Sequence, residues 1–439
     1  MNTMTWINRI RSWVDGWVED YHVALPHVAL ANCEQVAVVH DSYCQPVRLP
    51  VVRVTHAGER IAYATIQVAL DAAQTGERIE VPAGVFVEQL TIRQPVTVQG
   101  AGQGQTIIQA PQADVLRQSG NDWVDALGRA SFAVVAIRAV STGMVVLRDL
   151  TIDGRDQGYL PAYYALGNAR YYSFHGIAAW ESDVTLQGIT VTRINEFDNL
   201  QLATTQGSAD NTMRYAGMAH NESIFAESTA SIHTLTLQHS VVSGFQQSAV
   251  LAWGSQQRVS ITDNVFQGRM ATYHTAARVI QLGCHLVDYD QLGEVGGVIC
   301  RNRIVDLGRS WPMVATRQER LGEACGIALF GVRECLLEGN QLVRQDSAPW
   351  LGGTLPDGCY ANHGIVIKEK FSGSVQENTV SGFQVGIESS STDLNPDMYK
   401  HFLQTNKLRH NGKPCRFQGG ASESDVKRAR HEQLLEMLS

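Results

Sequence analysis

Four side chains that we expect in one column of a β-sheet have the chemistry of a sugar-binding surface. They are Trp180, Trp253, Phe330 and Lys368, and each lies three residues after an apolar residue of a recurring strand pattern. If those apolar residues point inward, this offset turns the four side chains outward, beside an outward column that contains Glu388. Aromatic rings stack on the apolar faces of sugars, while charged groups bind hydroxyls or a uronate carboxylate. The alternative is that long loops or an N-terminal helix cover the stripe.

A tyrosine-rich stretch just before the first of these strands supplies further candidates. Tyr171 and Tyr172 are predicted to bind substrate, and Arg170 and His175 are predicted to take part in catalysis. The competing interpretation is a loop held on the sheet by its aromatic residues. His175 and His363 both precede a strand glycine, and the strand phase predicts that both point inward in a structural role.

The combination of a cation and a histidine suits proton abstraction next to a uronate carboxylate. That reaction needs a cation to neutralise the carboxylate and a base of tuned pKa. Lys368, with Arg170 or His175 nearby, supplies both groups, and Glu388 completes the catalytic candidates.

Aspartate residues elsewhere in the sequence could support hydrolysis or Ca²⁺ binding. Hydrolysis of a glycosidic bond needs two carboxylates, and Asp149, Asp153 and Asp156 form the densest acidic cluster, but their sequence is equally typical of turns. Asp288 and Asp290 could bind Ca²⁺ through oxygen ligands. We predict no cofactor and no metal site, with Ca²⁺ as the alternative.

A repeat positions these candidates. Asn264, Asn302, Asn340 and Asn378 are spaced 38 residues apart, each with an apolar residue three positions before and two after. The same apolar frame recurs around Leu150, Ile189, Ser240 and Asn406. Repeats of this length indicate a solenoid. Asparagine tolerates the left-handed backbone of a tight bend, and its amide can bond the asparagine one coil away, so we predict an asparagine ladder.

The spacing also locates the insertions. Ser240 and Asn264 are 24 residues apart, a bare coil, so the longer spacing implies inserted loops. The excess precedes the first strand of a coil, where long loops usually carry function. The predicted loops are 154–174, 193–230, 306–324 and 344–362.

Residues 65–109 contain a short amphipathic helix that is followed by I-x-V-x-x-G-x-F-x-E and then by V-T-V-x-G-x-G. This pattern resembles the start of a right-handed parallel β-helix of the pectate-lyase-like superfamily. The resemblance covers about residues 61–415 and implies an all-β solenoid of about ten coils. The signatures of methylesterases, polygalacturonases and mannuronan epimerases are missing, so the resemblance transfers no catalytic residue.

We predict three parts of the chain. Residues 1–60 form an amphipathic helix and an irregular segment, residues 61–420 form the β-helix with its N-terminal capping helix, and residues 421–439 form a C-terminal helix. Helical caps suit a solenoid because its ends otherwise expose strand edges and apolar core.

The overall composition excludes some classes of binding partner and bears on the cellular compartment. The net charge of −8 without a long basic run argues against nucleic acid, and no apolar run is long enough for a membrane span. The eight cysteines include no C-x-x-C pair and are typical of buried thiols in a reducing compartment. No secretory signal is seen, so we expect a cytoplasmic protein or non-classical export.

The sequence therefore favours a carbohydrate-active β-helix, a lyase or epimerase acting on an acidic glycan over the first sheet. The alternative is a non-catalytic β-helix that serves as a binding or assembly module. The partner is a polysaccharide or glycan, and the oligomeric state is open.

Overall fold

The computed structural model describes most of one compact unit, Arg48–Ser439. The described residues are 49–119, 130–138, 143–158, 172–195, 220–268, 278–283, 295–305, 324–344, 362–383, 385–390 and 396–417. The predicted helices within 1–60 and 421–439 lie outside these residues. No described helix is long and apolar enough to cross a membrane.

The described chain begins with a short hairpin and a capping helix. Strand β1 (Val51–Val54) pairs antiparallel with β2 (Arg60–Tyr63), and helix α2 (Ile66–Ala72) follows. The predicted irregular segment is therefore wrong over β1, whose β-branched residues favour a strand. The helix itself is confirmed: the Thr65 side chain accepts a hydrogen bond from the Val68 N–H, and Ile66, Ala69 and Leu70 are buried.

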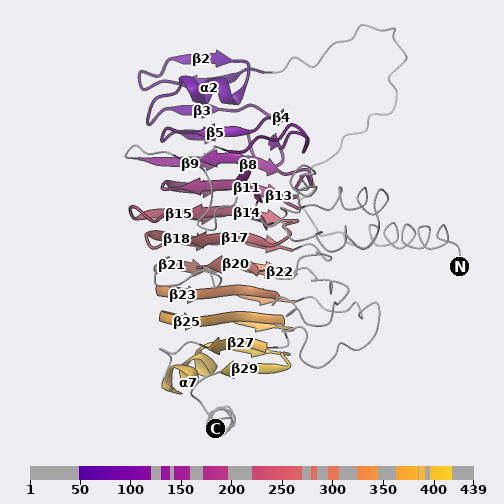
Figure 1. Ribbon diagram of the computed structural model, residues 1–439, viewed down its shortest axis with the longest axis vertical. Coiled ribbons are helices and arrows are strands. Elements are labelled where there is room, and N and C mark those ends of the chain that lie inside the picture. The colour runs from indigo at the N-terminus through magenta and orange to yellow at the C-terminus, as the bar shows by residue number, and fades with distance from the viewer. Residues whose placement is uncertain are drawn as a thin grey trace, which may run out of the picture. The chain divides into compact units, whose positions relative to one another are not determined.

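Three parallel sheets then form by stacking of successive coils, which confirms the predicted right-handed parallel β-helix (Figure 1). The first sheet consists of β5 (Leu90–Ile92), β8 (Ala130–Ile137), β11 (Tyr172–Trp180), β14 (His220–Glu227), β17 (Ser248–Trp253), β20 (Arg278–Leu282), β23 (Ala324–Glu338), β25 (Asn362–Gln376), β27 (Val385–Ser390) and β29 (Lys413–Phe417).

The second and third sheets complete each coil. The second consists of β3 (Arg78–Glu80), β6 (Thr97–Gln99), β9 (Met144–Arg148), β12 (Asp183–Gln187), β15 (His233–Gln238), β18 (Gln257–Thr262), β21 (Val295–Cys300) and the later halves of β23 and β25. The third consists of β4 (Gly84–Val87), β7 (Thr106–Gln109), β10 (Thr151–Asp153), β13 (Thr190–Thr192), β16 (Val241–Ser243), β19 (Val265–Gln267), β22 (Arg303–Val305), β24 (Gln341–Val343), β26 (Thr379–Ser381) and β28 (Lys407–Arg409).

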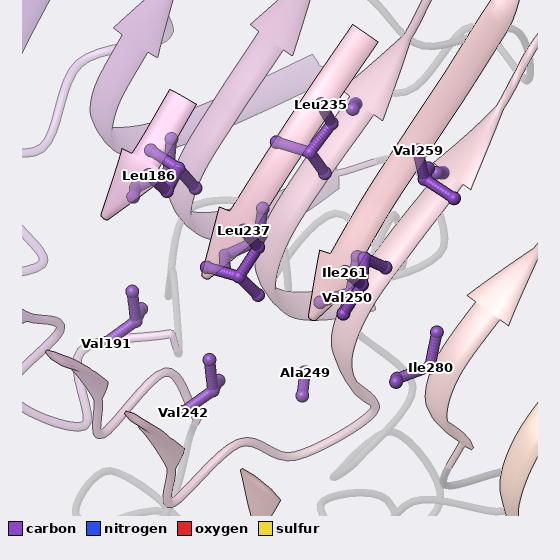
Figure 2. Close-up of a cluster of buried hydrophobic side chains, with 14 of the residues drawn as sticks. Leu186, Val191, Leu235, Leu237, Val242, Ala249, Val250, Val259, Ile261 and Ile280 are labelled. Carbon is purple, nitrogen blue, oxygen red and sulfur yellow. The ribbon is translucent and has the colours of Figure 1, made fainter. Parts of the chain in front are cut away.

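The three sheets enclose one continuous apolar core. Leu186, Leu237 and Ile261 from the second sheet meet Val242 from the third and Val250 from the first (Figure 2). Burial alternates along the second and third sheets, as expected for strands with one face on the core. Helix α7 (Pro396–Thr405) lies near the C-terminal end and contributes Phe402 and Leu403 to this core.

The predicted asparagine ladder is present in the turn before the third sheet. The Nδ2 of Asn264 donates to Oδ1 of Asn302 at 3.0 Å, and the same bond links Asn302 to Asn340, Asn340 to Asn378 and Asn378 to Asn406. Each Oδ1 also accepts the backbone N–H of the preceding asparagine. The ladder therefore satisfies buried backbone and side-chain groups together.

One detail of the ladder prediction was wrong. The left-handed residue of the bend is the one before the asparagine, as at Asp263 with φ 60°, Arg301 with φ 54° and Glu377 with φ 58°. The asparagine side chains point into the turn and are buried, so their amides are kept for the ladder while the less buried preceding residue adopts the bend.

The ends of the strands show where the predicted insertions lie in each coil. Strand β22 ends at Val305 and β23 begins at Ala324, and β24 ends at Val343 while β25 begins at Asn362. The extra residues therefore fall before a strand of the first sheet, as predicted from the spacing. Most of those residues lie outside the described part of the chain.

Candidate functional site

Strands of the first sheet turn two consecutive side chains into the core. Ala249 and Val250 both lie in the apolar core (Figure 2). A Cβ on Gly176 would meet Val191 and Ile194 of the core, although the following Ile177 also faces inward. The residue before each inward pair therefore faces outward.

This irregularity reverses the predicted orientation of two histidines. His175 stacks on Phe225, which belongs to a cluster outside the main core, and His363 lies against Glu388. The inward phase that we predicted for His175 and His363 is wrong, because a strictly alternating strand does not allow for the doubled inward position. Both histidines belong to the outer face of the first sheet.

Three outward columns form this face, called here the outer face. The first column contains His175, Glu222, Ser248, Arg278, Cys325 and His363. The second contains Ala178, Phe225, Leu251, Gln281, Ala328, Val366, Glu388 and Arg416. The third contains Trp180, Glu227, Trp253, Phe330 and Lys368, which confirms their predicted alignment.

Aromatic residues of the N-terminal half of this face are packed together. The Phe225 ring centroid lies 5.8 Å from that of Trp180 and 5.5 Å from that of Trp253, the latter edge-on. Trp253 and Phe330 are 2% and 1% exposed. The aromatic stripe is therefore covered, which was the alternative considered from the sequence.

His175 and Glu222 form a buried pair beside these aromatics. Nδ1 of His175 lies 3.1 Å from Oε2 of Glu222, and both side chains are at most 1% exposed. The imidazole stacks on Phe225 with 4.9 Å between centroids. The carboxylate of Glu222 lies beside Nδ1, and Nε2 on the other side of the ring has no hydrogen-bond partner.

A buried cation occupies the middle of the outer face. The Arg278 side chain is 6% exposed, its Nη1 donates to Oε1 of Gln281 at 3.0 Å, and its guanidinium lies 5.0 Å from the Phe330 ring centroid. Nζ of Lys368 lies 5.9 Å from the same ring. Among the described residues no carboxylate pairs with Arg278, which makes it a buried charge without its usual compensation.

His363 and Glu388 form a second buried pair next to these cations. Nε2 of His363 lies 2.7 Å from Oε2 of Glu388, and Nη1 of Arg416 lies 3.8 Å from the same oxygen. Burial alone would raise the pKa of Glu388, but the hydrogen bond to His363 and the charges of His363, Arg416 and Lys368 outweigh it and hold that pKa below its usual value. Glu388 is therefore ionised at neutral pH.

Several buried polar atoms of this face have no hydrogen-bond partner. Because Tyr172 and Phe174 lie in the core, the alternating Ser173 faces outward, and Ser131 has the same position on the preceding strand. Such atoms are rare in folded proteins, so they are positions at which a water or a ligand can bind. Among them are Ser131 Oγ, Ser173 Oγ, His175 Nε2, Ser248 Oγ, Arg278 Nε and His363 Nδ1.

The structure unites some predicted catalytic residues and separates others. Lys368 and Glu388 face outward on neighbouring strands, and the charge of Lys368 lowers the pKa of Glu388. His175 lies five strands away from β25, roughly 24 Å at the usual strand spacing. Arg170 lies outside the described residues, so the predicted set cannot form one site around both His175 and Lys368.

Of the two tyrosines predicted to bind substrate, the structure describes only Tyr172. Tyr171 lies outside the described residues. Tyr172 is fully buried in the main core, meets Phe132 edge-on, and donates its hydroxyl to the Gly158 carbonyl at 3.0 Å. These contacts give Tyr172 a structural role.

The acidic cluster of Asp149, Asp153 and Asp156 has a structural role in turns. Asp149 and Asp156 have left-handed φ angles of 56° and 58°, and Asp153 accepts hydrogen bonds from Arg193 and Gln109. Within the described part of the chain, no group of three or more histidine, cysteine or acidic side chains is arranged to hold a metal ion. Asp288 and Asp290 lie outside it.

Glu222, Arg278 and His363 are the residues of this site that the sequence did not assign. The signal was present: each stands directly before a consecutive pair of inward residues in the strand pattern, as Cys325 stands before Gly326 and Ile327. A strict two-residue alternation placed His363 on the wrong face.

Comparison with known proteins reveals similarity at the level of fold. The sequence matches no protein-family model and no curated protein. Among solved structures, a pectin methylesterase from Yersinia enterocolitica is similar at 12% identity and a TM-score of 0.36, covering 83% of this chain and 96% of that one.

Two further structures represent different activities. The A-module of a mannuronan C-5 epimerase from Azotobacter vinelandii has 14% identity and a TM-score of 0.31, covering 82% of this chain and 94% of that one. A surface adhesin of Streptococcus pneumoniae has 11% identity and a TM-score of 0.30, covering 81% of this chain and 89% of that one. These values are too low to transfer function, so the chemistry has to be inferred from the outer face itself.

Proposed function

We propose that the protein binds an acidic glycan along the outer face and acts on it as a lyase or epimerase. The observation that carries this proposal is Arg278, a buried guanidinium stacked on Phe330 with no carboxylate partner among the described residues. A bound uronate carboxylate would supply the missing negative charge, and Lys368 on the same ring would add a second cation.

The unpartnered hydroxyl and imidazole groups support a polyol ligand. Ser131, Ser173 and Ser248 present buried oxygens that can each donate and accept a hydrogen bond. Sugar hydroxyls have the same dual capacity. A glycan lying along the stacked strands would satisfy these groups in succession.

His363 is the base in this mechanism. With the uronate carboxylate held between Arg278 and Lys368, His363 removes the proton from the adjacent carbon, and the electron pair of that C–H bond moves toward the carboxylate as an enolate. The cations stabilise the developing charge, and the ionised Glu388 orients His363. Strand spacing separates Arg278 from His363 by roughly 10 Å, which leaves room for one sugar ring between them.

The enolate can then follow either of two routes. In a lyase, the enolate electron pair forms the carbon–carbon double bond, the bond from the neighbouring carbon to the glycosidic oxygen breaks, and the departing oxygen takes up a proton from water. In an epimerase, water delivers a proton to the same carbon from the opposite face. Both routes use the same cations and the same base.

A panel of uronate polymers tests this proposal. We expect one of them to bind and to yield either unsaturated product, detected by ultraviolet absorbance, or an inverted sugar, detected by NMR exchange in deuterated water. Arg278→Met should weaken binding about 10-fold to 100-fold, since a charge-assisted hydrogen bond contributes roughly 1.5–3 kcal/mol. Arg301→Met is the matched control, because Arg301 is an exposed arginine paired with Asp263 away from this face.

Burial of the outer face should slow ligand association, and it is also compatible with a second function, that of a non-catalytic binding module. Ligand can reach Arg278 only when the face opens, so association should be slower than for open sites. The near-complete burial of Trp253 and Phe330 equally suits a non-catalytic binding or assembly module. Binding of a uronate polymer without any turnover would support that module, whereas no binding to any acidic glycan would refute the proposal.

A further inference from the structure

A serine, a histidine and an aspartate are linked at the corner between the first and second sheets. Oγ of Ser231 lies 2.8 Å from Nε2 of His233, and Nδ1 of His233 lies 3.2 Å from Oδ2 of Asp183. Ser231 belongs to the exposed turn between β14 and β15, His233 begins β15, and Asp183 begins β12. Parallel pairing of β12 with β15 brings Asp183 beside His233, although 50 residues separate them in the sequence.

Backbone contacts hold the histidine and the aspartate in place. Oδ1 of Asp183 accepts the Thr234 N–H at 2.8 Å, so one carboxylate oxygen anchors the side chain while the other faces the imidazole. The backbone N–H of His233 donates to the Gln256 carbonyl. In the tautomer with its proton on Nδ1, that N–H donates to Asp183, and Nε2 accepts the hydroxyl of Ser231. This is the arrangement in which a histidine removes the proton of a serine nucleophile.

Backbone N–H groups beside Ser231 converge on one carboxylate. The N–H groups of Thr229, Ala230 and Ser231 donate to Glu181 at 2.7, 3.1 and 3.4 Å. Partial burial would raise the pKa of Glu181, but the bonds from Thr229 and Ala230 outweigh it and hold that pKa below its usual value. Oε2 of Glu181 also lies 3.9 Å from Nε2 of His233. An anionic oxygen therefore lies next to the serine, at donors that would equally stabilise the oxyanion formed when an ester carbonyl is attacked.

We propose that Ser231, His233 and Asp183 hydrolyse an ester of a short carboxylic acid. The site is open: Ser231 is exposed, and the neighbouring Ile232 is 63% exposed. Met144, which is 50% exposed, registers with Asp183 from β9. Two exposed apolar side chains at an open turn suit a short acyl group, whereas a long acyl chain would need an enclosed channel. This activity does not depend on the glycan site at the outer face.

Hydrolysis proceeds through an acyl-serine. Oγ of Ser231 attacks the carbonyl carbon, its proton passes to Nε2 of His233, and the new oxyanion displaces the Glu181 carboxylate from the three N–H groups. The intermediate then collapses, the bond to the alcohol oxygen breaks, and the alcohol leaves with the proton from His233. Water attacks the acyl-serine with His233 as base, which releases the carboxylic acid and restores Ser231. Asp183 is a positioning residue, since it acts through His233.

Covalent labelling of the full-length chain tests the proposal. A fluorophosphonate reacts with activated serines, and peptide mass spectrometry identifies the labelled residue. We expect the label on Ser231 and hydrolysis of p-nitrophenyl acetate. Ser231→Ala and His233→Gln should each lower the hydrolysis rate at least about 100-fold, with folding checked by circular dichroism. Ser243→Ala is the matched control, because the Ser243 hydroxyl bonds Thr192 on the third sheet.

Two further variants test the positioning residue and the oxyanion site. Asp183→Asn should slow labelling of Ser231 at least about 100-fold, and Asp183→Glu should restore part of the rate, which a purely structural aspartate would not do. Glu181→Ala should speed labelling, because it frees the three N–H groups. Slower labelling in Glu181→Ala would overturn the assignment of the oxyanion site.

The proposal as a whole fails if the wild-type protein takes up no label on Ser231. It also fails if folded Ser231→Ala hydrolyses the ester as fast as the wild-type protein. Should a variant not fold, labelling of the wild-type protein still decides, because it needs no substitution.

Discussion

Replacement of one ladder asparagine gives a direct test of how this solenoid is held together. In Asn340→Ala five hydrogen bonds disappear. Nδ2 donates to the carbonyls of Ile299 and Glu338 and to Oδ1 of Asn378, and Oδ1 accepts both the backbone N–H and the Nδ2–H of Asn302. Asn340 is completely buried, so water cannot replace these partners without the turn opening.

The expected cost follows from the groups left behind. Two donors of Asn302 lose their acceptor, and an unsatisfied buried group costs roughly 1–3 kcal/mol. Oδ1 of Asn378 still accepts the backbone N–H of residue 340, and the backbone of the turn is unchanged in Asn340→Ala. We therefore expect the free energy of unfolding to fall by about 3–5 kcal/mol in total. That is a large part of the roughly 5–15 kcal/mol that stabilises a typical domain.

Urea denaturation followed by far-ultraviolet circular dichroism measures this loss. Gln341→Ala is the matched control, since Gln341 is the adjacent exposed residue and should change the free energy of unfolding by less than about 0.5 kcal/mol. A loss below about 1 kcal/mol in Asn340→Ala would refute the ladder as an energetic element. A broadened or biphasic transition would show that the coils on the two sides of Asn340 unfold separately.

Three further predictions concern the outer face and the thiols. Trp253→Ala should lower the free energy of unfolding by about 3–5 kcal/mol, because the indole is buried against Phe225; a stable variant would show that the aromatic cluster is loosely packed. The pKa of Glu388 is depressed in the folded protein, so its stabilising contribution is present above the unfolded pKa of roughly 4.3 and is lost as pH falls through the folded pKa. Glu388→Gln should therefore lose less stability on acidification than the wild-type protein, and parallel pH profiles in thermal melts would contradict this. Burial raises the pKa of Cys335 to about 12, so iodoacetamide at mildly alkaline pH should label this thiol only in denaturant, as peptide mass spectrometry can check.

The sequence alone determined the solenoid and most of its internal order. The spacing of the asparagines and their apolar frames specified stacked coils, because a repeated core position and a repeated buried amide require the same turn in every coil. Alternation also placed Trp180, Trp253, Phe330 and Lys368 in one outward column, since residues paired across parallel strands share a face.

Tertiary structure decided which of these groups form a site. The doubled inward position before Ile177 and Val250 changes the phase of each strand, so His175 and His363 face outward, against the prediction from simple alternation. The distance between His175 and Lys368 depends on how many coils lie between them, which follows from the strand pairing. Burial was likewise beyond the sequence, because whether Arg278 keeps a counter-ion depends on residues that only the fold brings near it.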